Sequence, residues 1–285
     1  MRWQRKSATI MAVSFFIAIL VWSQMGMYLA HLLFGVNVKV NFFKFCISLF
    51  KENSLYYFLV ITFLNSLIAY AILITCLKIT QQYVLSRRFK TRLMSLRNII
   101  LTANIIQEFQ PLNQNIIVID HDRAMAFTVG FRRPLVVLSS GLIEMLDREE
   151  LEAVIAHEAF HQSNYDSLKI FLLQLISQSL WFIPVTKWTY RNYKLISELL
   201  ADEYAVQKTG SELGLGSALL KLIKKGFSDH PTPVLVYFSD GVVNYRLQQL
   251  VDPNQMIPVR LGMISIVISI HVLLLFMGMI VLAIT

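Results

Sequence analysis

Three long stretches without a charged side chain constrain most strongly how this chain can fold. They comprise residues 7–37, 53–77 and 261–285. Each is longer than the roughly 20 apolar residues that a helix needs to cross the hydrocarbon core of a bilayer. Hydrophobic residues make up 55% of the sequence and charged residues only 15%, which is outside the usual range for a soluble domain. The sequence therefore predicts a protein with several membrane spans.

The basic residues predict how these spans are oriented. Arg2, Arg5 and Lys6 precede the first stretch, which is too long for a signal-peptide core and is interpreted as a retained signal anchor. Basic residues and no acid lie between Lys78 and Arg97. By the positive-inside rule, the N-terminus and the region after the second span are cytoplasmic, and the C-terminus is outside. The expected parts are a membrane region, 1–77, with spans at about 7–34 and 54–77; a cytoplasmic domain, 78–260; and a transmembrane helix, 261–285.

Charge and cysteine content exclude several other classes of protein. The net charge of +8 is mostly a topological signal, and membrane lipid, anionic lipid in particular, is the expected partner. We expect no direct binding of nucleic acid, because the basic cluster adjoins a span and no aromatic stacking platform accompanies it. Cys46 and Cys76 fall near opposite membrane faces, so neither a disulfide nor a cysteine metal site is expected.

The segment His157-Glu158-Ala159-Phe160-His161 is the strongest chemical signal. Asp147 and Glu150 have the spacing of a capping box, so the segment is expected inside a helix that begins there. Histidines four apart on a helix lie one above the other, and both imidazoles can reach one metal ion. A catalytic zinc ion typically has three protein ligands, and a carboxylate from another helix would be the third. Glu158 could take a proton from the attacking water.

A fourth apolar stretch, residues 170–186, separates His161 from Glu198. If it crossed the membrane once, these two side chains would lie on opposite sides and could not share a metal ion. Pro184 favours a turn, after which the chain can run back antiparallel to the helix that carries the histidines. We therefore predict a membrane-proximal hairpin, residues 168–197, rather than a span.

A small sheet is expected before the histidine helix. Short aliphatic and β-branched runs bounded by turn residues predict strands at 116–119, 124–130 and 135–138. Ser139 or Ser140 could cap a short helix, 141–146. An exposed sheet edge can bind an extended peptide as an added strand, and the candidate edge residues are Ala126, Phe127 and Thr128. An ordinary structural sheet is the alternative.

These residues resemble the gluzincin metalloproteases, and within them the BlaR/MecR-type integral membrane antirepressor proteases. The resemblance covers roughly residues 80–250. It rests on the two-histidine motif, the spacing to Glu198, and three short patterns: Glu198-x-x-x-Asp202, Ala126-Phe127-Thr128-x-Gly130 and Trp181-Phe182-x-Pro184. HtpX- and Ste24-type membrane proteases share the zinc motif and a similar Ala-Phe strand, and are the near alternative. The fold implied is mainly α with a small β-sheet: a multi-span membrane protein with a cytoplasmic gluzincin-type zinc metalloprotease domain.

The resemblance also implies roles for individual residues. His157, His161 and Glu198 would bind Zn²⁺, one ion per chain, and Glu158 would be the general base. Asp202 lies one helical turn beyond Glu198 and could accept a hydrogen bond from His157, which would fix the tautomer of that ring. The donor that stabilises the oxyanion is left open among His230, Tyr237 and Arg246.

The main functional hypothesis is a membrane zinc endopeptidase that cleaves a BlaI/MecI-type winged-helix repressor in response to a signal. One alternative is an HtpX/Ste24-like protease for membrane protein quality control. Another, from a different class, is a non-catalytic metal-binding membrane sensor. The chain stops at Thr285, without the penicillin-binding domain of the antibiotic sensors, so direct β-lactam sensing is not expected.

Two further expectations concern assembly and signal. A homodimer is compatible with the sequence. Soft ligands near the outer ends of the first and last spans, and a histidine within the last, suggest a copper-responsive site. Its residues would be Met25, Met27, His31, His271, Met277 and Met279.

Overall fold

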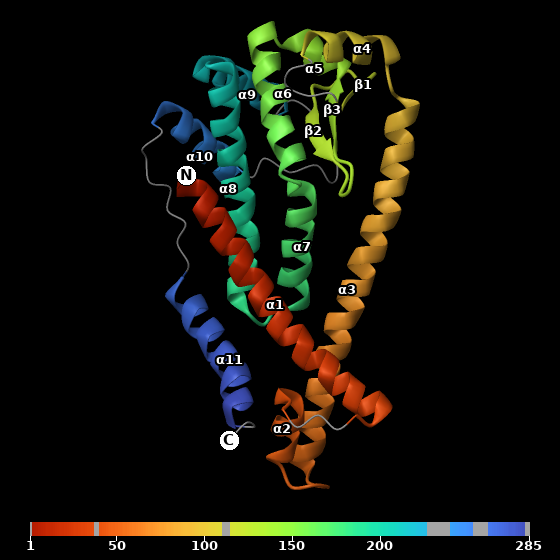
Figure 1. Cartoon of the computed structure of the whole chain (residues 1–285), viewed down its shortest axis with the longest axis vertical. Coiled ribbons are helices and arrows are strands. Elements are labelled where there is room, and N and C mark those ends of the chain that lie inside the picture. The colour runs from red at the N-terminus through yellow and green to blue at the C-terminus, as the bar shows by residue number, and fades with distance from the viewer. Residues whose placement is uncertain (1, 37–39, 110–114, 227–239, 253–261, 283–285) are drawn as a thin grey trace. The chain divides into compact units, whose positions relative to one another are not determined.

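The computed structural model describes residues 2–36, 40–109, 115–226, 240–252 and 262–282 (Figure 1). Within them the chain is mainly helical, with one three-stranded sheet, as the sequence predicted. The chain divides into two compact units. Unit 1 comprises Met1–Ser7, Tyr83–Phe171 and Lys194–Pro258, and unit 2 comprises Ala8–Gln82, Leu172–Tyr193 and Val259–Thr285.

Unit 2 is an assembly of apolar helices. Its parts come from α1 (Arg2–Phe34), α2 (Phe42–Ser48), α3 (Leu55–Ser95), α7 (Asp166–Ser179), α8 (Pro184–Thr209) and α11 (Met263–Leu282). Buried side chains of α1, such as Ile17, cluster with Ile68 of α3 and Ile176 of α7. Phe42 of α2 stacks on Phe276 of α11, with ring centroids 4.1 Å apart. Burial of apolar side chains is what holds this unit together.

Two of the described helices, Trp3–Phe34 and Leu55–Ser95, are long and apolar enough to cross a membrane. They contain the first two predicted spans. The helix of the second span does not end near Leu77 but continues unbroken through the basic residues to Ser95. In α11, the apolar segment whose side chains are described is the shorter Met263–Phe276, so the third span stays a prediction.

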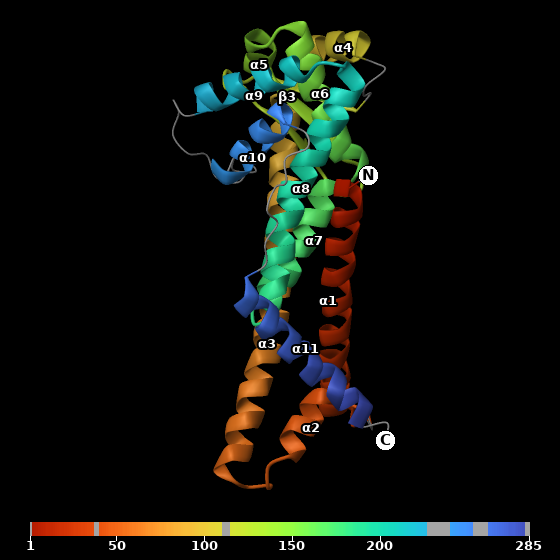
Figure 2. The same ribbon diagram turned by 90° about the vertical axis from the view of Figure 1, so that its left-hand side faces the viewer.

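The predicted chain reversal between His161 and Glu198 is present. The helix α7 ends at Ser179 and α8 begins at Pro184, whose fixed φ suits the first position of a helix. The two helices lie side by side in both side views (Figures 1 and 2). Ser269 of α11 accepts a hydrogen bond from the N–H of Val185 at 3.0 Å and so caps the start of α8.

The sheet lies in unit 1. Its strands are β1 (Ile116–Ile119), β2 (Ala126–Val129) and β3 (Leu135–Ser139). The order is β1-β3-β2, with β1 parallel and β2 antiparallel to the central β3. All three predicted strands are confirmed, although β2 is shorter than predicted. Ser139 accepts from the N–H of Leu142 at 3.1 Å and caps α5 (Ser140–Met145).

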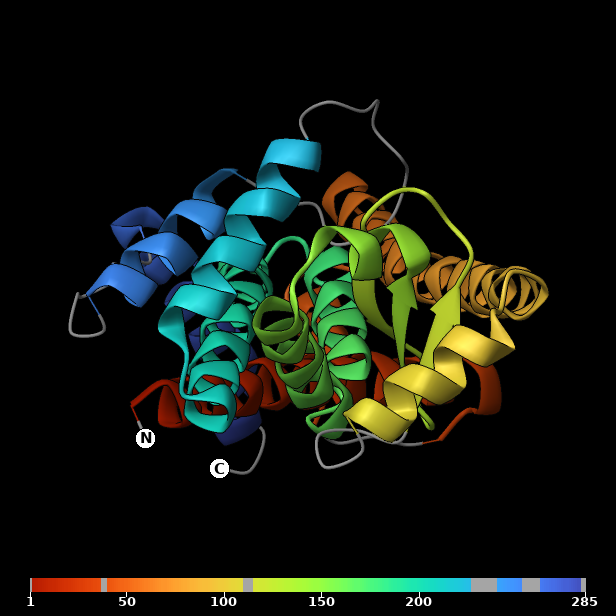
Figure 3. The same cartoon turned by 90° about the horizontal axis from the view of Figure 1, so that it is seen from above.

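The helix α6 (Arg148–Ser163) carries the two-histidine motif. Its capping box is complete: the side chain of Asp147 accepts from the N–H of Glu150, and the Glu150 carboxylate accepts from the N–H of Asp147. Figure 3 shows α6 between the sheet and α9 (Glu212–Gly226), and both contact it. Ala153 and Ala156 of α6 pack with Ala205 of α8 in one buried cluster. Unit 1 also contains α4 (Ile99–Glu108) and α10 (Asp240–Val251).

Candidate active site

Three potential metal ligands converge between α6 and α8 in unit 1. The Nε2 atoms of His157 and His161 are 3.1 Å apart. The carboxylate of Glu198 lies 3.5 Å from His157 Nε2 and 3.6 Å from His161 Nε2. Ligand atoms about 2.0–2.1 Å from a tetrahedral zinc ion are separated from one another by about 3.3–3.4 Å. The three side chains therefore fit a single zinc ion in both donor type and spacing.

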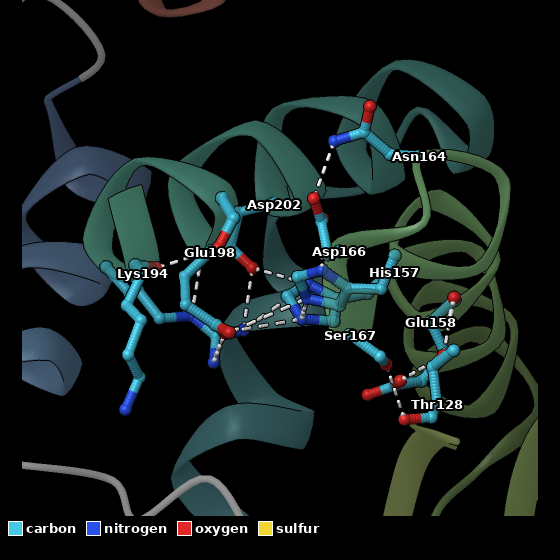
Figure 4. Close-up of polar contacts among 12 residues, drawn as sticks. Thr128, His157, Glu158, Asn164, Asp166, Ser167, Lys194, Glu198 and Asp202 are labelled. Carbon is cyan, nitrogen blue, oxygen red and sulfur yellow. Dashed lines mark hydrogen bonds and ion pairs between the residues drawn. The ribbon is translucent and has the colours of Figure 1, made fainter. Parts of the chain in front are cut away.

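Each histidine is held by a carboxylate of its own. Nδ1 of His157 lies 2.9 Å from Asp202 Oδ1, which is the contact that the sequence predicted. Nδ1 of His161 lies 2.8 Å from Asp166 Oδ2. An Nδ1–H that donates to a carboxylate leaves the lone pair of Nε2 free for a metal ion. Figure 4 shows His157, Asp202 and Glu198 drawn together with Asp166.

Asp166 is a site residue that the sequence analysis missed. It is the first residue of α7, directly after a turn in which Tyr165 has a positive φ of 54°. Its Oδ1 accepts from Asn164 Nδ2 at 2.7 Å, and Lys169 Nζ in turn donates to Asn164 Oδ1 at 2.7 Å. An acid that follows the second histidine by five residues was the available signal. Without the turn geometry, this spacing does not show that the side chain comes back to His161.

Arg246 reaches the same site from α10. Its Nε and Nη2 donate to the two oxygens of Asp202, both at 2.7 Å, and its Nη1 lies 3.1 Å from Glu198 Oε2. The side chain is buried. Three of its five N–H groups are thus directed at the carboxylates of Asp202 and Glu198. A role of Arg246 as oxyanion donor stays a prediction. The other two oxyanion candidates, His230 and Tyr237, lie outside the described residues.

The electrostatics of the cluster favour a cation. Burial raises the pKa of Glu198, but His157, His161 and Arg246 lower it by more than burial raises it. The net result is a pKa well below the usual range of a glutamate. Burial and Arg246 lower the pKa of His157, whereas Asp202 and Glu198 raise it, with a net result of about 9. Four carboxyl groups lie in or beside the cluster, those of Glu158, Asp166, Glu198 and Asp202. The guanidinium of Arg246 lies among them and carries one positive charge. This excess of negative charge suits a divalent metal ion.

Glu158 lies next to the ligands and is held by the sheet. It is buried, with 8% of its surface exposed. The hydroxyl of Thr128 in β2 lies 2.9 Å from Glu158 Oε2 and 3.0 Å from its backbone oxygen (Figure 4). The strand β2, which contains Ala126 and Phe127 as well, is an edge strand. The structure thus brings the expected base and the expected peptide-binding edge together.

The described residues do not test the copper hypothesis, which stays a prediction. Nδ1 of His31 bonds the backbone oxygen of Val36 at 2.8 Å, and Nδ1 of His271 bonds that of Val267 at 2.7 Å. The side chain of Met25 is buried in the apolar core of unit 2, and that of Met27 is partly buried. The side chains of Met277 and Met279 lie outside the described part of the chain.

Comparison with known proteins agrees with the geometry of the site: both indicate a peptidase. Residues 92–195 match the family model described as Peptidase family M48. The similarity is to peptidases. The match includes both histidines and Glu158 but ends before Glu198, which the fold brings to them.

Curated relatives are proteases named HtpX. The protein from Sodalis glossinidius is 33% identical over 98 residues, 33% of this chain and 30% of that protein. The one from Aeromonas hydrophila is 44% identical over 57 residues, 19% of this chain and 20% of its own length. This chain therefore spans less than a third of the length of these relatives. The findings support a metallopeptidase. They favour the HtpX-like alternative and do not support the BlaR/MecR-type assignment.

Proposed function

We propose that this protein is a membrane-bound zinc metalloendopeptidase of the HtpX-like kind. The observation that carries the proposal is the convergence of His157, His161 and Glu198 with zinc-like spacing, next to a buried Glu158. The similarity to Peptidase family M48 and to HtpX proteases supports the same conclusion.

The residues divide the work of peptide hydrolysis among them. His157, His161 and Glu198 would hold zinc, which when bound supplies Lewis-acid activation of water and of the substrate carbonyl. Glu158 takes the proton of the attacking water and passes it to the amine of the leaving product. Asp202 and Asp166 fix the rings of the two histidines. The edge strand β2 binds the substrate as an extended segment.

Membrane proteins that have lost their native fold are the substrate class that we propose. The HtpX-like resemblance supports this class, and the two helices long and apolar enough to span a bilayer support a location beside such substrates. We further propose that unit 1 faces the cytoplasm and that the apolar helices contact membrane lipid. Incubating the purified protein with an unfolded membrane protein and with a winged-helix repressor compares the two substrate classes directly. Preferential cleavage of the repressor would contradict the proposed class.

Replacing Glu158 by glutamine tests the mechanism itself. The full chain, purified in detergent, is expected to bind about one zinc ion per chain and to cleave a quenched fluorescent peptide. Glu158→Gln should retain zinc but lose at least about 100-fold in kcat, because an amide cannot accept the proton. Glu152→Gln is the matched control: it lies on the same helix α6, outside the cluster, and should keep full activity. Zinc binding without cleavage by the unsubstituted chain would favour the non-catalytic sensor instead.

A further inference from the structure

The hydrogen-bonding register of β2 shows which of its backbone groups face outward. The N–H of Ser139 donates to the carbonyl of Met125 at 3.0 Å, across the ladder between β3 and β2. The N–H of Val136 instead donates to Asn115, on the side of β1, at 3.0 Å. Val136 is the partner of Thr128 in the antiparallel register. Because bonded and non-bonded pairs alternate in such a ladder, the backbone N–H and C=O of Ala126 and Thr128 point away from β3.

Thr128 also contacts the base through its side chain. Its hydroxyl lies 2.9 Å from Glu158 Oε2. One residue therefore presents its backbone to the open edge and its side chain to the carboxylate beside the metal ligands. The carbonyl of Thr128 accepts a hydrogen bond from the Ser167 hydroxyl of α7 at 3.2 Å. The strand is thereby tied to both α6 and α7 at this residue, as Figure 4 shows for Thr128, Glu158 and Ser167.

We propose that Thr128 is a positioning residue that fixes the Glu158 carboxylate relative to a bound peptide. This inference rests on the proposed peptidase function. A peptide added to β2 would bond at the outward groups of Ala126 and at the N–H of Thr128, because Ser167 already holds the Thr128 carbonyl. Thr128 would then determine the register of the bound peptide and also orient the base, Glu158. A misplacement of about 1 Å between reacting groups can cost two orders of magnitude in rate. Holding Glu158 and the bound peptide through the same residue would keep such a misplacement small.

The hydroxyl, rather than the shape of the side chain, carries this role. Valine has nearly the same volume and the same β-branch as threonine, so Thr128→Val keeps the strand and removes the hydroxyl with its contacts to Oε2 and to the backbone oxygen of Glu158. Serine keeps the hydroxyl and loses the methyl group. The two variants therefore separate positioning of Glu158 from packing of β2 against α6.

The experiment measures kcat, KM, zinc content and melting temperature of the full chain in detergent. Thr128→Val is expected to lower kcat about tenfold, the effect of losing one hydrogen bond to a charged group, with KM changed less than about twofold and zinc retained. Thr128→Ser should stay within about threefold of the unsubstituted kcat. Thr102→Val is the matched control, because it removes a buried hydroxyl elsewhere in unit 1, where Thr102 bonds Asn98 and Val118. It should lower the melting temperature and leave kcat unchanged.

Three results would overturn the proposal: an unchanged kcat in Thr128→Val, equal impairment in the valine and serine variants, or loss of zinc in Thr128→Val. A second readout does not depend on turnover. The infrared carboxylate band of Glu158, isolated as the difference between the unsubstituted chain and Glu158→Gln, should shift in Thr128→Val and not in Thr102→Val. If the unsubstituted chain cleaves no peptide, the proposed function fails, and the infrared band still decides whether Thr128 orients Glu158.

Discussion

At the scale of single residues, the candidate zinc site depends on carboxylates that do not touch the metal position. Asp202 and Asp166 each accept the Nδ1–H of one histidine, and Arg246 ties Asp202 to the third ligand, Glu198. Asp166 lies in α7, Asp202 and Glu198 lie in α8, and Arg246 lies in α10, whereas both histidines lie in α6. Their mutual contacts hold the two Nε2 atoms and the Glu198 carboxylate at the spacing that zinc requires.

Replacing Asp166 by asparagine tests the importance of this support. The amide is a weaker acceptor, so the ring of His161 is held less firmly, and zinc affinity should fall about 10–100-fold. Competition with a chromogenic chelator measures the affinity. Asp120→Asn is the control, since Asp120 bonds Asn98, away from the cluster. An affinity for zinc unchanged by Asp166→Asn would show that Asp166 does not orient the ligand.

The stabilising effect of zinc should depend on pH. In the metal-free protein the pKa of His157 is raised from its ordinary value of 6.5 to about 9. A histidine with a raised pKa stabilises the fold below about pH 6.5 and loses this contribution as the pH rises through about 9. Zinc needs the unprotonated ring, so protons compete with it over the same window. The increase in melting temperature caused by saturating zinc should therefore grow from pH 6.5 to about 9. An increase that stays constant over this range would contradict the assignment.

At the scale of helices and strands, local patterns account for many of the boundaries. Aliphatic runs predicted β1 and β3, and Asp147 with Glu150 predicted the start of α6. Pro184 predicted the reversal before α8. These features depend on residues close in sequence, so the pattern of residue types is sufficient to find them. The position of α10 could not be predicted in this way, because Arg246 contacts a residue, Asp202, that lies 44 positions earlier in the sequence.

Arg246 of α10 contacts Asp202 and Glu198 of α8, and its replacement by methionine tests how much these contacts stabilise the protein. The change removes the guanidinium charge from beside two neighbouring carboxylates, the buried Asp202 and the partly buried Glu198. The free energy of unfolding of the metal-free protein should fall by about 3–5 kcal/mol. Chemical denaturation in detergent measures it. Arg148→Met, which removes an exposed arginine paired with Glu108, is the control and should change the stability by less than about 1 kcal/mol. Equal effects of the two substitutions would show that the buried pair has no special weight.

At the scale of the whole molecule, the two units do not coincide with the parts expected from the sequence. The hairpin segment Leu172–Tyr193 belongs to the apolar unit 2, although it lies between two segments of unit 1. The long helices α1, α3, α7 and α8 each contribute residues to both units. Charge-free runs identify helices that prefer an apolar environment, but not which of them pack together.

Reporter fusions test the predicted orientation. Fusions after residue 100 and after residue 210, both in unit 1, should report the cytoplasm, because the basic residues after the second predicted span favour that side. A fusion after residue 50, between the first two predicted spans, should report the opposite side. Fusions after residues 100 and 210 that report opposite sides would mean that residues 170–186 cross the membrane, and the single-zinc arrangement would have to be abandoned.

The sequence by itself determined the metal-binding motif, the strands, the capping box and the helices able to span a bilayer. Each of these follows from a repeating pattern or a short spacing along the chain. The tertiary structure decided the rest: that Glu198 meets the two histidines, that Asp166 and Arg246 support the ligands, and that Thr128 joins the sheet edge to Glu158. These contacts join helices and strands whose relative positions are set by the packing of the whole core. That packing cannot be predicted from any local pattern of residues.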